Sequence, residues 1–125
     1  MDPIANMFSQ IHNAYSSEKK ILMIPFSNLR MAILAIMKKN QFITGFNEMK
    51  SDNMKKIQIE LNSSRLNFRR LSRPGRRFYS TSREIPRPRG EKGLVIISTS
   101  SGMMNGEEAR QKGLGGEVIA EIARE

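Results

Sequence analysis

Apolar side chains in the first 40 residues follow a helical spacing, then a short continuous run, then a helical spacing again. A helix is predicted over about 3–16, since Asp2-Pro3 is a favourable helix start and apolar residues recur three and four positions apart. The run 20–25, closed by Pro25, predicts a buried strand. Ser27 is then expected to cap a second helix that ends at two lysines. The predicted inward positions are Ile4, Met7, Phe8, Ile11 and Tyr15 in the first helix and Leu29, Ile33, Ile36 and Met37 in the second.

The next elements are extended. Apolar and polar residues alternate in 55–62, which together with 41–49 flanks Ser51-Asp52-Asn53, so these segments predict a hairpin. The chain stays extended at 66–70 until Pro74-Gly75 forces a turn.

Four further elements are expected after this turn. A short strand is predicted at 77–80, and the β-branched run 93–99 predicts a strand at the centre of its sheet. Asn105, with a Glu three residues later, resembles a capping box, and Gly113 suits a helix end, so a helix of about two turns is expected between them. A closing strand is predicted at 117–122.

These elements predict a mixed α/β fold of the α+β type with two small, tightly packed lobes. Residues 1–64 would form an amino-terminal lobe in the order helix, strand, helix, hairpin. Residues 65–125 would form a carboxyl-terminal lobe with a mostly antiparallel sheet and one short helix. A chain of 125 residues fits this plan and is too short for a typical two-domain enzyme.

Positive charge is concentrated in one segment. The chain has 21 Lys or Arg and 12 Asp or Glu, a net charge of +9, and residues 65–92 alone hold ten of the cations and only two of the acids. Nine of those ten are Arg, whose guanidinium group suits phosphates and bases, whereas an ordinary solvated face mixes Lys with acids. We therefore expect a polyanionic partner. Nucleic acid is favoured over an anionic membrane surface, because the helix at 3–16 has no Lys or Arg to face lipid headgroups.

Other chemistries have little support in the sequence. The chain has no Cys, which excludes disulfides, thiolate metal sites and Cys nucleophiles. His12 is the single His and has no carboxylate at an orienting spacing, and the glycines in 113–116 stand in the wrong order for a dinucleotide fingerprint. The apolar run 29–37 is too short to span a membrane, and the amino terminus shows the features of neither a signal peptide nor an import presequence. We expect no enzyme activity, cofactor, metal, small-molecule substrate or membrane partner.

The hydroxyl-rich end of the strand 93–99 is a second candidate contact. Ser98, Thr99, Ser100 and Ser101 precede Gly102 there, and hydroxyl groups bond base edges, ribose 2′-hydroxyls and phosphates. The same residue types also form ordinary turns, so composition alone leaves both interpretations open.

Several stretches together resemble one family. They are Asp2-Pro3-Ile4-Ala5-Asn6-Met7, Ser72-Arg73-Pro74-Gly75 followed by Tyr79, Ser98-Thr99-Ser100-Ser101-Gly102, and Gly115-Gly116-Glu117-Val118. Their order and approximate spacing are similar to those of the bacterial-type ribosomal small-subunit protein eight family. The resemblance implies a structural RNA-binding protein that binds the central domain of small-subunit rRNA and supports its assembly. In this family context, Glu117 would accept from a base amino group or hold the hydroxyl loop in place.

The resemblance and the charge pattern together give the expected RNA-binding residues. They are Arg69, Arg70, Arg73, Arg76, Arg77, Tyr79, Arg87, Arg89, Ser98, Thr99, Ser100, Gly102 and Glu117.

The implied partners are small-subunit rRNA and neighbouring small-subunit proteins, protein five among them. A free-standing RNA-binding regulator with the same fold is the alternative function. The high Asn, Met and Ile content favours a ribosome of the mitochondrial matrix over one of the bacterial cytoplasm or a plastid.

Overall fold

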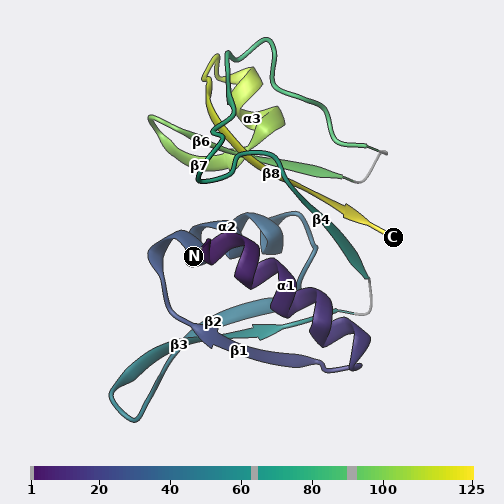
Figure 1. The fold of residues 1–125 in the computed structure, drawn as a ribbon, viewed down its shortest axis with the longest axis vertical. Coiled ribbons are helices and arrows are strands. Elements are labelled where there is room, and N and C mark those ends of the chain that lie inside the picture. The colour runs from purple at the N-terminus through teal and green to yellow at the C-terminus, as the bar shows by residue number, and fades with distance from the viewer. Residues whose placement is uncertain (1, 63–64, 90–92) are drawn as a thin grey trace. The chain divides into compact units, whose positions relative to one another are not determined.

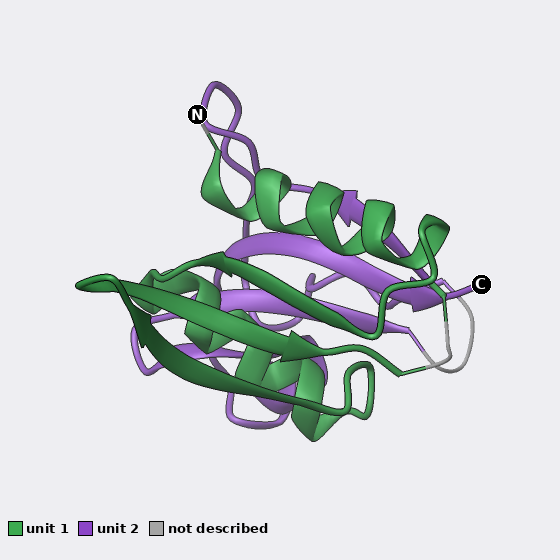
Figure 2. Cartoon of the chain, turned by 90° about the horizontal axis from the view of Figure 1, so that it is seen from below, with its two compact units in different colours: residues 1–65 green, residues 66–125 purple. Residues whose placement is uncertain are grey.

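The computed structural model describes residues 2–62, 65–89 and 93–125. The chain divides into two compact units, residues 1–65 and 66–125 (Figure 2). Each unit combines helix with antiparallel sheet, so the predicted mixed α/β class is confirmed. Ser63 and Ser64 at the predicted lobe boundary, and Gly90, Glu91 and Lys92 of the basic segment, lie outside the described residues.

The first unit is a three-stranded antiparallel sheet with both of its helices on one side (Figure 1). Its strand order is β1-β3-β2. The predicted caps are confirmed, since the side chains of Asp2 and Ser27 accept hydrogen bonds from the first turns of their helices, at 3.1 and 3.0 Å. In chain order the elements are α1 (Pro3–Ser16), β1 (Ile21–Pro25), α2 (Asn28–Lys39), β2 (Gly45–Ser51) and β3 (Met54–Glu60).

The strand β1 differs from its prediction. Only Ile24 of its five residues is buried, and Ile21 and Met23 are among the exposed apolar side chains. The reason is that β1 is an edge strand of a sheet whose other side the helices do not cover, so its side chains alternate between core and surface. The prediction of a buried strand at 20–25 from its continuous apolar run was therefore wrong.

The inward face of α2 also differs at its start. Leu29 is 37% exposed, whereas Arg30 is 5% exposed. The Arg30 guanidinium donates to the carbonyl oxygens of Pro25 at 2.9 Å and Pro3 at 3.2 Å. A buried cation needs such acceptors, and helical spacing alone does not reveal them.

The predicted hairpin is confirmed as β2 and β3, which pair from Gly45↔Glu60 to Ser51↔Met54. Asp52 and Asn53 form its two-residue turn, with φ values of 51° and 64°. Two consecutive positive φ angles match the right-handed twist of the flanking strands, and Asp and Asn tolerate this backbone better than most residues.

The second unit contains a five-stranded antiparallel sheet. Its order is β4-β8-β6-β7, with β5 also paired to β8, so the predicted central place of the 93–99 strand is confirmed. The short helix is confirmed with Asn105 as its cap, whose side chain accepts from the Glu107 amide at 3.0 Å. The elements are β4 (Leu66–Arg70), β5 (Tyr79–Ser80), β6 (Leu94–Thr99), β7 (Gly102–Asn105), α3 (Gly106–Gln111) and β8 (Gly116–Arg124).

Three strands of this unit depart from the sequence pattern. β5 has two residues instead of four, β8 continues to Arg124, and β7 was not predicted. β7 was missed because the segment after Gly102 has no alternation of its own and gains its ladder from β6. One hydrophobic core cluster of the unit lies between the sheet and α3 and consists of Ile85, Val95, Ile97, Met104, Ala109 and Val118, with Leu71 and Leu114 packed against it.

A buried phenol makes the fold sensitive to alkali. Tyr15 is 9% exposed and its hydroxyl has no hydrogen-bond partner among the described residues. Burial raises the pKa of Tyr15 from 10.0 to about 12. Between pH 10 and 12 the unfolded chain therefore binds fewer protons than the folded chain, and the free energy of unfolding should fall as the pH rises through this interval.

Urea unfolding at a series of pH values measures this effect. The variant Tyr15→Phe should be stable at pH 7 and should lose the slope between pH 10 and 12. Tyr79→Phe is the control, because Tyr79 is 69% exposed. A slope that survives in Tyr15→Phe would assign the alkaline transition to another group.

Candidate nucleic-acid interface

Strand β8 brings the candidate residues of three segments together. Tyr79 of β5 and Ser98 of β6 both lie directly opposite Glu117 of β8. Residues that face each other across antiparallel strands point to the same side of the sheet. An aromatic ring, a carboxylate and a hydroxyl therefore stand in one row.

Two glycines allow the strands to approach β8 this closely. A Cβ atom at Gly116 would lie 2.0 Å from the carbonyl oxygen of Ser98, and one at Gly115 would lie 2.5 Å from that of Ser80. Backbone atoms on both sides therefore exclude any side chain at these positions. The pair of glycines sets the spacing between β5, β8 and β6.

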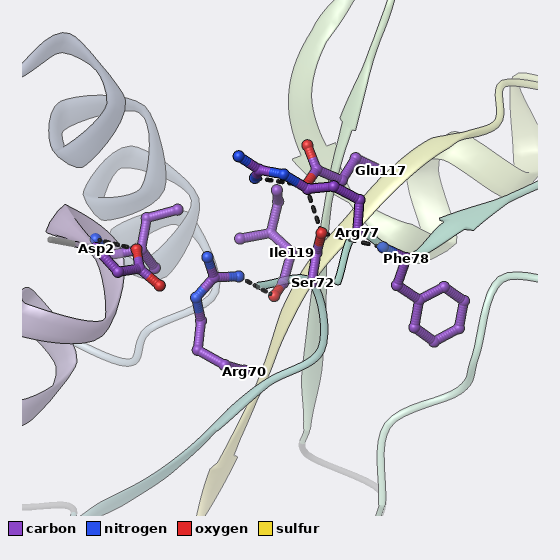
Figure 3. A network of polar contacts seen from close by, with 8 residues as sticks. Asp2, Arg70, Ser72, Arg77, Phe78, Glu117 and Ile119 are labelled. Carbon is purple, nitrogen blue, oxygen red and sulfur yellow. Dashed lines mark hydrogen bonds and ion pairs between the residues drawn. The ribbon is translucent and has the colours of Figure 1, made fainter. Parts of the chain in front are cut away.

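Glu117 holds the turn formed by residues 72–78, here called the basic turn, as Figure 3 shows. Its carboxylate accepts hydrogen bonds from the Ser72 hydroxyl and, at 3.0 Å, from Nη1 of Arg77. The Ser72 oxygen also accepts from the Phe78 amide at 3.1 Å, which closes the neck of the turn. The resemblance implied that Glu117 would accept from a base amino group or hold the hydroxyl loop. In the structure its carboxylate instead bonds to Ser72 and Arg77 of the basic turn.

Ser72 supports the candidate site and is not among the RNA-binding residues expected from the sequence. It is fully buried, and in the sequence it stands out only as part of the stretch Ser72-Arg73-Pro74-Gly75. A hydroxyl that joins Glu117, 45 residues away, to the neck of the turn has no signature in local spacing. The available signal was its place directly before Arg73 in the motif that carries the resemblance.

The basic turn borders an open hollow of about 560 Å³. Two backbone hydrogen bonds between Arg73 and Arg76, of 3.0 and 2.9 Å, close the turn. Both side chains are exposed, and in the described part of the chain neither has a carboxylate partner. The hollow is lined by Arg69, Arg70, Leu71, Arg73, Arg76, Arg77, Phe78 and Tyr79.

The hydroxyl groups after β6 have different tasks. The Thr99 hydroxyl donates to the Gly102 carbonyl at 2.9 Å and accepts from the Ser101 amide at 3.1 Å, so it shapes the turn between β6 and β7. Gly102 has a φ of 107°, which favours glycine. Ser100 and Ser101 are exposed at the tip. The loop thus presents serine hydroxyls on a frame that Thr99 and Gly102 fix.

The remaining predicted arginines are not all at this end of β8. Arg70 donates from Nη1 to the Ile119 carbonyl at 2.7 Å and so braces β4 on β8. Arg69 pairs with Glu121 at 3.7 Å, and the Arg89 amide also donates to Glu121. Arg87 pairs with Glu107 of α3 at 3.9 Å. Glu121, four residues further along β8 than Glu117, is thus the partner of Arg69 and Arg89.

Within the described residues no group of three or more His, Asp or Glu is placed to hold a metal ion. None of the helices there is both long and apolar enough to cross a membrane. His12 is exposed on α1, in the other unit from the residues described above.

Comparison with known proteins gives a consistent result. Residues 2–123 match the family model described as Ribosomal protein S8. Proteins named small ribosomal subunit protein uS8 are 41% identical in Mycoplasmopsis pulmonis, 36% in Zymomonas mobilis and 38% in Streptococcus thermophilus. Each similarity covers 97% of this chain and 96% of the relative.

Proposed function

The chain belongs to the ribosomal protein S8 family, and from this premise we propose that its second unit binds the central domain of small-subunit rRNA during subunit assembly. The protein is a structural component of the small ribosomal subunit and is not an enzyme. The proposal concerns the RNA segment and the residues that contact it.

The observation that carries the proposal is that the basic turn, the exposed ring of Tyr79 and the serine loop after β6 all meet at β8. Exposed guanidinium groups at Arg73 and Arg76 suit phosphates, and they carry affinity without sequence information. Tyr79 offers a ring for a splayed base. Ser98 and Ser100 suit 2′-hydroxyls and base edges, which supply discrimination.

The other predicted residues support these contacts. Glu117 and Arg77 set the turn, and Thr99 and Gly102 set the loop. A carboxylate beside phosphates would be repelled unless it were paired, and the ion pair with Arg77 meets that condition.

Titration of the purified chain with a central-domain RNA fragment tests the proposal. The logarithm of the binding constant should fall linearly with the logarithm of salt concentration, because arginine contacts release counterions. A scrambled RNA of equal length and an unrelated DNA duplex serve as controls and should bind more weakly. Equal affinity for all three, or an affinity independent of salt, would overturn the proposal.

Neighbouring small-subunit proteins, protein five among them, are proposed as further partners. Co-sedimentation with small subunits at moderate salt distinguishes this role from that of a free-standing RNA-binding regulator, which would stay in the supernatant. The relatives are bacterial and lend no support to the mitochondrial matrix. The small ribosomal subunit is therefore the location we adopt.

A further inference from the structure

Glu121 is a carboxylate in the middle of an otherwise apolar part of β8. It is 6% exposed, and its strand neighbours from Val118 to Ile122 are all buried. Directly opposite it stand Val95 of β6, which belongs to the core beneath α3, and Arg69 of β4. An ionised group in this place is costly unless hydrogen bonds and a cation compensate it.

The segment 85–89 supplies part of that compensation. The Arg89 amide donates to Glu121 Oε2, and Arg69 Nη1 lies 3.7 Å from Oε1. The two oxygens of the carboxylate therefore have different partners. Oε1 pairs with the half-exposed side chain of Arg69, and Oε2 accepts from the backbone amide of Arg89.

The same segment is fixed at its other end by independent contacts. The Ile85 side chain is 3% exposed in the core, and its carbonyl accepts from Arg110 Nη2 at 2.5 Å. A Cβ atom at Gly93 would lie 2.5 Å from the Pro88 side chain, so this part of the segment runs tightly against the start of the 93–99 run. Between Ile85 and Arg89 the guanidinium of Arg87 is exposed, and among the described residues its only ion pair is the long one to Glu107.

From this arrangement we propose that Glu121 is a positioning residue of the RNA-binding surface. Its buried carboxylate clamps the backbone at Arg89 and thereby fixes where Arg87 and Arg89 present their guanidinium groups. The inference rests on the proposed function, because it assigns a task to a residue behind that surface. Without the hydrogen bond to Glu121 the segment would keep its contacts at Ile85 and Pro88 but lose its backbone anchor at Arg89. Ordering Arg87 and Arg89 on RNA would then cost additional conformational entropy.

Two substitutions of Glu121 separate the effect of its hydrogen bond to the Arg89 amide from the effect of its negative charge. Glu121→Gln keeps an oxygen that accepts from the Arg89 amide and removes the charge. Glu121→Met keeps the length and approximate volume and removes the acceptor. Glu108→Gln and Glu108→Met are matched controls on α3, where Glu108 pairs with Lys112 at 3.2 Å on the surface.

The first measurement is hydrogen exchange of the free protein. The Arg89 amide should stay protected in Glu121→Gln and exchange at least about tenfold faster in Glu121→Met, while amides of β6 and β8 remain protected in both. Equal protection in the two variants would show that the carboxylate oxygen does not hold the segment, and it would overturn the proposal.

The second measurement is affinity for the central-domain RNA fragment in a double-mutant cycle. Glu121→Met should weaken binding about fivefold to tenfold in the natural chain and less than about twofold in a chain that also carries Arg87→Ala and Arg89→Ala. Glu121→Gln and both Glu108 variants should stay within about twofold. A loss that is the same in both backgrounds would mean that Glu121 only stabilises the fold.

The outcomes distinguish this inference from the function on which it rests. If the natural chain fails to bind the RNA fragment, the proposed function fails. If it binds and the cycle shows no coupling, only the role of Glu121 fails. Should Glu121→Met not fold, Glu121→Gln still decides, because loss of Arg89 protection or of affinity in that variant would assign the effect to charge and overturn the clamp.

Discussion

Replacing Gly116 with Ala should destabilise the second unit by about 3 kcal/mol or more. The added Cβ would lie 2.0 Å from the Ser98 carbonyl oxygen and 3.1 Å from the Thr99 Cα. Both are backbone atoms of β6, so no side chain can move aside, and the ladder between β6 and β8 must open. The same opening would move Ser98 and Glu117 apart and disperse the candidate site.

Urea unfolding measures this cost, and Gly75→Ala is the matched control. Gly75 lies in the basic turn, where a Cβ atom meets nothing within 4 Å, and its change should stay within about 0.5 kcal/mol. If both alanine variants unfold at the same urea concentration, close approach is not what Gly116 provides.

Replacing both Arg73 and Arg76 with Ala should produce the largest loss of RNA affinity among surface substitutions. Each guanidinium is exposed, and in the described chain neither is occupied by a carboxylate, so each is available to a phosphate. Removing two phosphate contacts should lower the slope of log affinity against log salt by about one to two units. Binding to cognate and scrambled RNA should weaken alike, because phosphate contacts carry no sequence information.

Ser100→Ala is the contrasting variant for the same titration. A neutral hydrogen bond releases no counterions, so the affinity for cognate RNA should fall by about 1–3 kcal/mol with an unchanged salt slope. Discrimination against scrambled RNA should decrease. If the serine and arginine variants changed slope and discrimination in the same way, the hydroxyl loop would be a turn and nothing more.

Much of the candidate surface was predictable because its chemistry is local in sequence. The concentration of Arg in 65–92 and the run of hydroxyls before Gly102 are visible without a fold. The sequence did not distinguish residues that are available to RNA from residues that support the protein's own loops and strands. Thr99, Arg70 and Glu117 look like potential RNA ligands in the sequence, and in the structure their polar groups bond to the protein itself.

Glu121 shows the opposite case, a residue that the sequence interpretation passed over. One acid inside the apolar stretch 118–122 was an available signal, since a half-buried strand rarely places a carboxylate among buried neighbours. Its partner at Arg89 lies 32 residues away, and only the folded chain brings the two together.

The sequence by itself determined the helices α1 and α2, their caps, the β2–β3 hairpin and the strand β6, together with the positive charge of the second unit. These features depend on residues within about four positions of one another, through backbone hydrogen bonds, turn conformations and side-chain periodicity. The tertiary structure alone decided that β8 pairs with β4, β5 and β6, that Arg30 is buried, and that Ser72 and Glu117 join the basic turn to the sheet. Strand register and the partners of buried polar groups are set by which backbones can approach one another in space, and a one-residue shift would move each side chain to the other face of the sheet.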